Sequence, residues 1–176
     1  MSKELNMYCT KEKMEDGSVR KTIGFVGYWL SNFFLMPFFI DGVKFNCVEQ
    51  FFHWKKAVHF GDKETADLIL AEENPKEQKK LGRAVKNFNP KIWEDISYDV
   101  MLEGLYAKFS VEGMKYVLLD TGDAFIREDA PYDEFWGTGL SCDEALKGEK
   151  VAKGKNNLGK ALMETRSKIR EEMGLA

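Results

Sequence analysis

The chain has 176 residues, of which 44% are hydrophobic and 31% charged, as in ordinary soluble globular proteins. This length suffices to bury a substantial core, so we expect a single domain over residues 21–176, preceded by a polar N-terminal extension or hairpin over residues 1–20. The net charge of −3 excludes a general electrostatic attraction to nucleic acid, although a local basic patch is compatible with it.

The three cysteines, Cys9, Cys47 and Cys142, are scattered and form no CxxC motif. They therefore predict neither a disulfide framework nor a zinc site, and we expect no metal and no cofactor. The N-terminus has no apolar run typical of a signal peptide, and no segment reaches membrane-spanning length. We expect a cytoplasmic protein with no membrane partner.

The first third of the chain predicts short strands. Residues 15–18 predict a turn, the tip of a hairpin that leads into a strand over residues 21–27. Residues 28–40 are densely aromatic but contain Asn32 and Pro37, which fit neither a long helix nor a central strand. The Asp41-Gly42 pair then predicts a tight hairpin turn between residues 39–40 and 43–45.

A helix over residues 47–58, capped by Asn46, is expected to have two different sides. The expected core side is apolar and consists of Cys47, Phe51, Trp54 and Val58. The opposite side carries Glu49, Phe52, His53 and Lys56. Glu49 and Lys56 would lie roughly 10 Å apart along the helix, far enough to flank a small molecule. The alternative is that both are solvated surface charges.

The rest of the chain predicts mainly helices. Asp62, Asn74-Pro75 and Asn89-Pro90 are start signals. The expected helices cover residues 63–72, 75–86, 90 through 109, 114–119, and from about 157 through 169. The interval 121–154 is rich in glycine and acidic residues, and predicts loops with short extended pieces such as 125–127.

Residues 128–139 place several carboxylates beside three aromatic side chains. Such a loop can set Asp133 against a ribose while Trp136 covers a ring, or it can simply be solvated. It lacks the spacing of a calcium loop. Residues 154–160 are expected to begin a helix and are flanked by glycines. Free backbone N–H groups there can hold a phosphate. The alternative is a plain helix cap. No serine lies in a nucleophile-elbow sequence, so hydrolysis by a serine triad is not expected.

Taken in order, these segments resemble the NADAR family of YbiA-like proteins, over roughly residues 23 to 170. The matching pieces are Leu30-Ser31-Asn32-Phe33, Val48-Glu49 with Phe52 and Lys56, Trp93, Val100-Met101, Ala107-Lys108-Phe109, Leu118-Leu119, Thr121-Gly122-Asp123, Glu128, Pro131, Asp133, Trp136-Gly137, Gly154-Lys155-Asn156, Leu158-Gly159, Leu162-Met163 and Arg166. The ordered series is specific, whereas any one piece is weak.

The resemblance implies a mainly α fold with small β-hairpins (α+β), compact and single-domain. It also implies N-glycosidase activity on ribosylated bases. The implied catalytic residues are Glu49, Lys56 and Asp133. The implied substrate-binding residues are Ser31, Asn32, Phe52, Trp93, Glu128, Trp136, Gly137 and Asn156, and we add Phe25 as a ring available for stacking.

Two chemical routes fit these residue types. A carboxylate can stabilise positive charge on the ribose and supply a proton to the leaving base. Alternatively, Lys56 can attack the anomeric carbon of a ring-opened ribose to form a Schiff base. The oligomeric state stays open.

The sequence departs from the YbiA-like pattern before residue 30, which bears on substrate choice. We therefore expect ADP-ribosylated guanine in DNA or RNA as substrate. The alternatives are early riboflavin-pathway intermediates or another ribose-phosphate molecule, or a module that binds ADP-ribose or NAD without catalysis.

Overall fold

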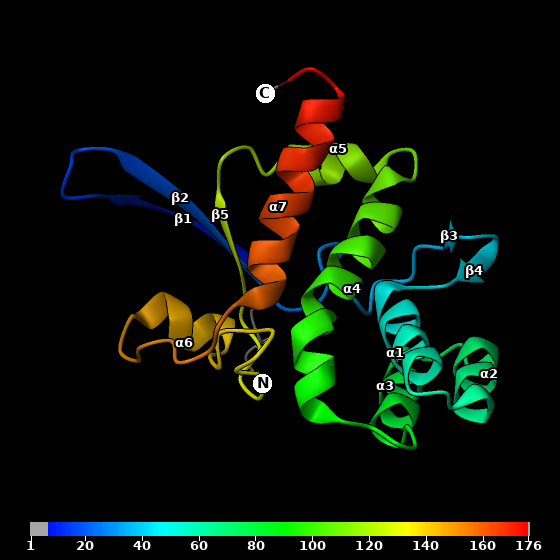
Figure 1. Cartoon of the computed structure of the whole chain (residues 1–176). Helices are drawn as coiled ribbons and strands as arrows, with labels where there is room; N and C mark the ends of the chain where they lie inside the picture. The colour runs from blue at the N-terminus through cyan, green and yellow to red at the C-terminus, as the bar shows by residue number, and fades with distance from the viewer. Residues whose placement is uncertain (1–6, 176) are drawn as a thin grey trace. The chain divides into compact units, whose positions relative to one another are not determined.

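The computed structural model describes residues 7–175, which form two compact units. The first unit contains residues 7–31 and 115–175, and the second contains residues 32–114. The expected fold class, mainly α with small β elements, is confirmed (Figure 1). Among residues 7–175, no helix is long and apolar enough to cross a membrane.

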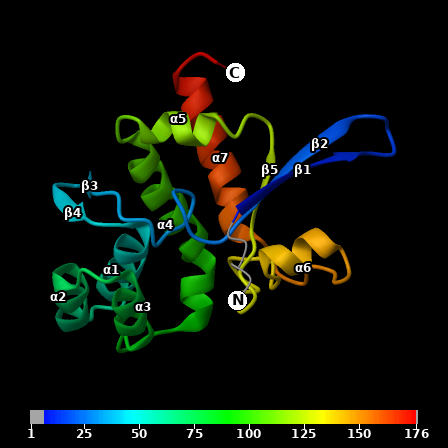
Figure 2. The same cartoon turned by 180° about the vertical axis from the view of Figure 1, so that it is seen from behind.

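The first unit is built on a three-stranded sheet. Its strands are β1 (Met7–Lys13), β2 (Val19–Phe25) and β5 (Phe125–Glu128). β1 and β2 form the predicted hairpin, while β5 pairs with β2 in parallel from Thr22 onward. The tip of the hairpin therefore extends beyond Phe125, the first residue of β5, as Figures 1 and 2 show. β2 begins two residues before the expected start, and its pairing with β5 was not predicted.

Three helices accompany this sheet in sequence: α5 (Met114–Leu119), α6 (Cys142–Lys147) and α7 (Asn157–Glu172). α7 packs along β5 (Figure 2). α5 and α7 were predicted, whereas α6 lies in the interval expected to be loops. α6 begins with a capping box of Ser141 and Glu144 and ends at Gly148 in the left-handed region. These short-range signals stabilise a short helix despite the acidic surroundings.

The second unit begins with a hairpin and continues with four helices. Strands β3 (Phe38–Ile40) and β4 (Val43–Phe45) are joined at Asp41 and Gly42, both with positive φ, which confirms the predicted tight turn. The helices are α1 (Val48–His59), α2 (Lys63–Ala71), α3 (Pro75–Arg83) and α4 (Pro90–Ser110). α3 ends three residues earlier than expected.

The predicted caps of the later helices are present. The side chains of Asp62, Asn74 and Asn89 each accept a hydrogen bond from a backbone N–H of the first turn of α2, α3 and α4 respectively. The prediction that Asn46 caps α1 is wrong. Cys47 occupies the N-cap position, and the Asn46 amide instead donates to the carbonyl of Glu73 and accepts from Gln78. Asn46 thus ties the start of α1 to the segment that precedes α3.

Aromatic side chains form much of the core of the second unit. Phe45 meets Phe51 edge to face with 5.1 Å between ring centroids, and Trp54 lies 5.2 Å from Phe45. A further apolar cluster joins α1 to α2 and contains Ala57, Ala66, Ile69 and Val85, with Trp54, Phe60 and Leu81 packed against it. The interpretation of the aromatic surplus as a Phe-rich core therefore holds for this unit.

Candidate active site

The α1 helix is buried on both of its sides. It packs against α2, α3 and α4, so that Glu49, Phe52, His53 and Lys56 are each less than 8% exposed. The alternative, that Glu49 and Lys56 are solvated surface charges, is wrong. The assignment of Val58 to the core is also wrong, because Val58 is 48% exposed. The sequence pattern of α1 resembles an amphipathic helix, but its polar side faces protein.

Glu49 is held by His53 one helical turn away. The distance between Glu49 Oε1 and His53 Nε2 is 2.9 Å, and both side chains are at least nine-tenths buried. The Glu49 backbone N–H donates to the carbonyl of Asn32. Among residues 7–175, no hydrogen bond reaches the second carboxylate oxygen, Oε2. Glu49 is therefore a buried acid with one engaged oxygen.

Lys56 is buried without a carboxylate partner among the described residues. Its Nζ donates to the carbonyl oxygen of Gly82 at 2.8 Å and lies 3.7 Å from the centroid of the Phe88 ring. Burial lowers the pKa of Lys56 from its usual 10.5, because the charged amine loses its water. A larger fraction of neutral amine at physiological pH is what nucleophilic attack requires.

Gly82 on α3 lies directly against the imidazole of His53. A Cβ placed on Gly82 would lie 2.0 Å from His53 Nδ1, so only glycine lets the two helices approach at this point. The same residue accepts the Lys56 hydrogen bond. His53 Nδ1 is buried and has no hydrogen-bond partner in the described part of the chain.

Asn32, an expected ligand contact, leaves one polar atom unused. Its Nδ2 contacts Met101 Sδ at 3.3 Å, while its buried Oδ1 has no partner among residues 7–175. A buried carbonyl oxygen without a donor costs free energy unless a ligand or water satisfies it. Asn32 therefore stays a candidate ligand contact.

The expected ring contacts Phe52 and Trp93 belong to one aromatic group. Their centroids lie 5.1 Å apart in an edge-to-face arrangement, and Trp93 also lies near His59 and Phe60. Trp93 is only 8% exposed, so most of its ring surface is covered by protein. Its role in substrate binding stays a prediction.

The expected stacking role of Phe25 is wrong. The ring of Phe25, the last residue of β2, is completely buried in the core of the protein, so it offers no face to a base. Ser31 is also buried, and its backbone N–H donates to the carbonyl of Tyr28.

In the first unit, Asp133 organises the loop that follows β5. Its Oδ1 accepts hydrogen bonds from the backbone N–H groups of Phe135 at 3.1 Å and Trp136 at 2.7 Å. No hydrogen bond from the described residues reaches Oδ2. Asp133, like Glu49, thus has one oxygen fixed by the protein and one that is not.

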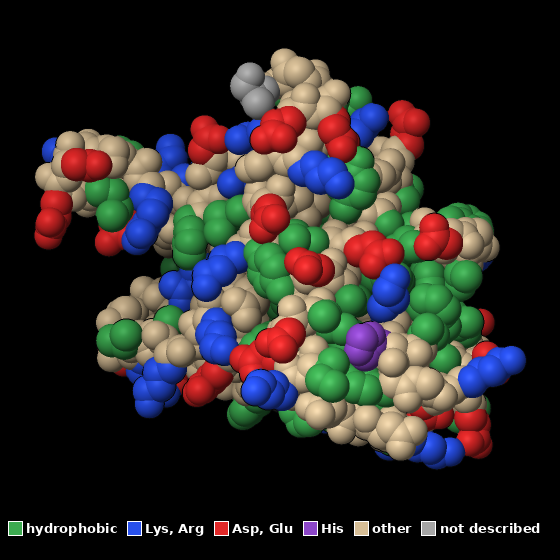
Figure 3. Space-filling view, viewed as in Figure 1, with side chains coloured by type: hydrophobic (Ala, Val, Ile, Leu, Met, Phe, Trp, Pro, Cys, Tyr) green, Lys and Arg blue, Asp and Glu red, His purple; other side chains and the backbone are tan. Residues whose placement is uncertain are grey.

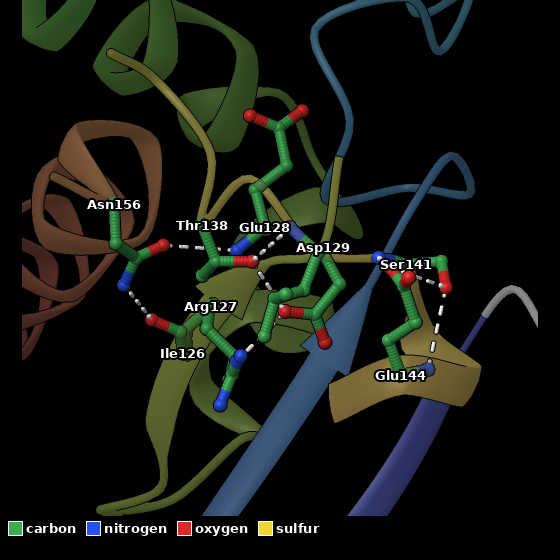
Figure 4. Close-up of polar contacts among 9 residues, drawn as sticks. Ile126, Arg127, Glu128, Asp129, Thr138, Ser141, Glu144 and Asn156 are labelled. Atoms are coloured by element: carbon green, nitrogen blue, oxygen red, sulfur yellow. Dashed lines mark hydrogen bonds and ion pairs between the residues drawn. The ribbon is translucent and has the colours of Figure 1, made fainter. Parts of the chain in front are cut away.

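Asn156 joins the loop to β5. Its side-chain amide accepts from the Glu128 backbone N–H and donates to the carbonyl of Ile126, each at 2.9 Å (Figure 4). Gly137 accepts the Asn156 backbone N–H. The carboxyl group of Glu128 points away from these backbone contacts (Figure 4). The Asn156 side chain therefore serves the backbone, and its contact with a ligand stays a prediction.

The expectation of free backbone N–H groups at the entry to α7 is wrong for most of the segment. The N–H groups of Gly154, Lys155, Asn156 and Leu158 all donate to carbonyl oxygens of residues 134–138. A Cβ on Gly154 would lie 2.2 Å from the Gly137 carbonyl oxygen. The glycines thus serve close backbone packing rather than a phosphate cradle. Asn156 is the N-cap residue, but its side chain makes no cap hydrogen bond.

Sequence reasoning missed two buried charged residues. Asp129 is completely buried and accepts hydrogen bonds from Arg127 Nε and Thr138 Oγ1, each at 2.8 Å (Figure 4). Lys108 of α4 is also completely buried, and burial lowers its pKa to about 7. Lys108 belongs to a segment that carries the family resemblance, but nothing local distinguishes a buried lysine from a surface one.

The described residues offer no evident set of ligands for a metal ion. Within residues 7–175, no group of three or more His, Cys, Asp or Glu side chains is arranged to hold a metal ion. The thiols of Cys47 and Cys142 are buried, which raises their pKa to about 11 and about 12. Both are therefore protonated at neutral pH and poor as metal ligands or nucleophiles.

Comparisons with known proteins identify relatives of this chain. The model of the NADAR domain matches residues 20–170. An N-glycosidase of Acanthamoeba polyphaga mimivirus is 41% identical over 126 residues, which cover 70% of this chain and 72% of the relative. An N-glycosidase of Nostoc punctiforme is 31% identical over 160 residues, covering 88% and 96% of the two chains.

A solved structure extends the likeness to the fold. The NMR structure of the Escherichia coli protein YbiA matches with a TM-score of 0.73 and 28% sequence identity, over 88% of each chain. The family model covers most of the chain, and two relatives are more than 30% identical over two thirds or more of it. The chain therefore belongs to the NADAR family.

Proposed function

We propose that the chain is an N-glycosidase that cleaves the bond between ribose and guanine in ADP-ribosylated nucleic acid. The general activity follows from the family, because the relatives in Acanthamoeba polyphaga mimivirus and Nostoc punctiforme are named N-glycosidases, which are hydrolases acting on N-glycosyl bonds. The substrate, its ADP-ribosyl group and a cytoplasmic site of action are our proposals.

The observation that carries the proposal is the buried Glu49 carboxylate. Cleavage of an N-glycosyl bond builds positive charge on the ribose ring, and a carboxylate in a poorly solvated site stabilises that charge strongly. Glu49 is 5% exposed, and no lysine or arginine among residues 7–175 forms an ion pair with it. Among the described residues, its negative charge is therefore not neutralised by a lysine or an arginine.

Lys56 supports a covalent variant of the reaction. In that route the ribose ring opens so that C1 is joined to the base as an imine, and the neutral amine attacks C1. The base then leaves with a proton, and water hydrolyses the resulting Schiff base to regenerate the amine. The lowered pKa of Lys56 favours this role. The alternative is that Lys56 stays protonated and anchors an anionic group of the substrate.

Asp133 enters the proposal through the family match. We assign it to proton transfer, because its Oδ1 is fixed by two backbone N–H groups and its Oδ2 is not hydrogen-bonded by the described residues. Asn32, Trp93, Glu128 and Trp136 are proposed as contacts of the ribose, phosphates or base. Substitution of each residue, followed by measurement of KM, tests its proposed contact.

The choice of a nucleic-acid substrate rests on residues near the first strands. The sequence departs from the YbiA-like pattern before residue 30, where it forms the β1-β2 hairpin. Directly after β2, Tyr28 and Trp29 are 50% and 38% exposed, with 5.8 Å between their ring centroids. Exposed aromatic rings are suited to stack on unpaired bases. Acidic and basic side chains are interspersed over the face in Figure 3, so that face has no broad basic surface.

The test is a comparison of substrates with one enzyme preparation. Wild-type protein is incubated with guanine-ADP-ribosylated single-stranded DNA and, separately, with the pyrimidine intermediates of riboflavin synthesis, and released base is measured by chromatography. We expect release from the DNA and loss of that release in Glu49→Gln. Release only from the pyrimidines would favour the metabolite substrate.

A binding module without catalysis is the rival from another class. Tight ADP-ribose binding by calorimetry, with no base released from either substrate at high enzyme concentration, would favour it. Sodium borohydride added during turnover separates the two roles of Lys56. An adduct trapped on Lys56 supports the covalent route, whereas activity retained in Lys56→Ala would exclude it.

A further inference from the structure

His53 is the one side chain that hydrogen-bonds the carboxylate of Glu49 among the described residues. Nothing in the proposed chemistry assigns it a role. We propose that His53 is a positioning residue, which holds the Glu49 carboxylate in one orientation by donating from Nε2 and directs Oε2 toward the reacting ribose. This inference rests on the proposed function, because it assigns the orientation of the same catalytic acid.

The first argument concerns which nitrogen of His53 carries the proton. Nε2 lies 2.9 Å from Glu49 Oε1, and Nδ1 is buried against Gly82 without a partner among residues 7–175. A proton on Nδ1 would be a buried donor without an acceptor, which is costly. The arrangement therefore favours a neutral imidazole with its single proton on Nε2.

The second argument concerns the charge of Glu49. A neutral donor orients a carboxylate through a hydrogen bond but leaves its full negative charge in place, whereas a lysine or arginine would neutralise it. Lys56, on the same helix, donates to the Gly82 carbonyl oxygen instead of to Glu49. The negative charge of Glu49 thus remains available to stabilise positive charge on the ribose.

The third argument concerns rigidity. The His53 ring is 7% exposed, lies against the backbone of Gly82 on one side and meets the Phe52 ring edge to face at 5.4 Å between centroids. These contacts restrict rotation of the imidazole. They thereby also restrict the position of Glu49 Oε1, to which the imidazole is hydrogen-bonded. A catalytic carboxylate that is held by a packed neighbour loses little entropy when the reaction begins.

Two substitutions of His53 separate positioning from packing. His53→Gln keeps an amide N–H that can reach the carboxylate, whereas His53→Leu keeps a comparable volume and removes the donor. We expect His53→Leu to lower kcat by about 100-fold with little change in KM, since misplacement by about 1 Å has effects of this size. We expect His53→Gln to recover kcat to within about tenfold of wild type.

Gly82→Ala and His59→Gln complete the set. The added methyl group of Gly82→Ala displaces the imidazole without removing it, so kcat should fall as in His53→Leu. His59 lies on the same helix but is exposed, so His59→Gln should leave kcat unchanged. Thermal unfolding of every variant identifies those that remain folded.

The tautomer gives a readout that does not depend on activity. The chain has two histidines, so a ¹⁵N-histidine spectrum of His59→Gln reports His53 alone. We expect a protonated Nε2 and an unprotonated Nδ1. Chemical shifts of the opposite tautomer would overturn the proposal, even if turnover is normal.

The outcomes also separate this proposal from the proposed function. If wild-type protein turns over substrate and folded His53→Leu does so equally well, or if His53→Gln is as impaired as His53→Leu, the positioning role is wrong and the proposed function stands. If wild-type protein releases no base from any substrate, the proposed function fails and the positioning role fails with it. Loss in His53→Leu, recovery in His53→Gln and the Nε2–H tautomer together support the proposal.

Discussion

Lys108 makes the stability of the protein depend on pH in a way that can be measured. Its side chain is completely buried in α4, with its Nζ 4.9 Å from the centroid of the Phe109 ring and 5.5 Å from that of Phe34. Burial lowers its pKa to about 7, and the nearby Cys47 opposes this shift. In the unfolded chain the same amine has a pKa of about 10.4.

The sign and size of the effect follow from proton binding. Between the folded and the unfolded pKa, the unfolded state binds the proton more tightly, so the free energy of unfolding rises as pH rises through this window. Integrating from pH 7 to pH 9 gives a gain of about 2 kcal/mol from Lys108 alone. Below the folded pKa both states are protonated, and the contribution no longer changes with pH.

The assay is urea unfolding of wild type and Lys108→Met at pH 7 and pH 9. Each protein is compared with itself, so packing lost on substitution cancels in the difference. The buried thiols of Cys47 and Cys142 act in the opposite direction, because burial raises their pKa to about 11 and about 12, above the value of about 8.5 in the unfolded chain. The contribution of Lys108 is therefore read from the difference between wild type and Lys108→Met. An exposed control, Lys80→Met, should show the wild-type pH dependence.

The reasoning is refuted by either of two results. If the free energy of unfolding changes between pH 7 and pH 9 by the same amount in Lys108→Met as in wild type, the titrating group is not Lys108. If the wild-type change exceeds that of Lys108→Met by far less than about 2 kcal/mol, Lys108 is solvated or paired strongly enough to keep a pKa near its usual value. The expected result is a wild-type change that is more positive than that of Lys108→Met by about 2 kcal/mol and is matched by Lys80→Met.

Three further predictions concern chemistry, capping and backbone packing. Because burial lowers the pKa of Lys56, borohydride trapping on Lys56 should reach its plateau at a pH below the usual lysine value of 10.5; a plateau at that value would contradict the lowered pKa. Asn89→Ala should cost about 1 kcal/mol in urea unfolding, since Asn89 caps α4 through two backbone N–H groups, and Asn89→Ser should recover most of it. Gly154→Ala should lower the melting temperature by calorimetry because its Cβ would meet the Gly137 carbonyl oxygen at 2.2 Å, whereas Lys153→Ala, at an exposed neighbouring position, should not.

Local signals account for the elements that the sequence predicted well. Asp41-Gly42 specifies a turn because both residues adopt positive φ. The Asn89-Pro90 start of α4 was predictable because the asparagine side chain and the proline ring act within one helical turn. α6 carries a capping box of the same kind, and a search for Ser141 and Glu144 at this spacing would have found it.

The errors arose where a distant segment decides the outcome. β5 pairs in parallel with β2 although the two strands are far apart in sequence, and no local pattern encodes that partner. Asn46 has the side chain of a good helix cap, but it binds Glu73 and Gln78 instead. Phe25 resembled an available aromatic ring because its burial depends on the whole fold.

The α1 helix shows what helical periodicity could not reveal about the residues that we propose as catalytic. Periodicity separates apolar from polar positions, and on that basis the face with Glu49 and Lys56 should be solvated. α2, α3 and α4 cover α1 instead, and burial changes what these residues can do. A solvated lysine is charged and unreactive, whereas burial lowers the pKa of Lys56. A solvated carboxylate is screened by water, whereas Glu49 is buried and held by His53. The reactivity that we propose therefore comes from the burial of polar residues that the sequence pattern assigned to the surface.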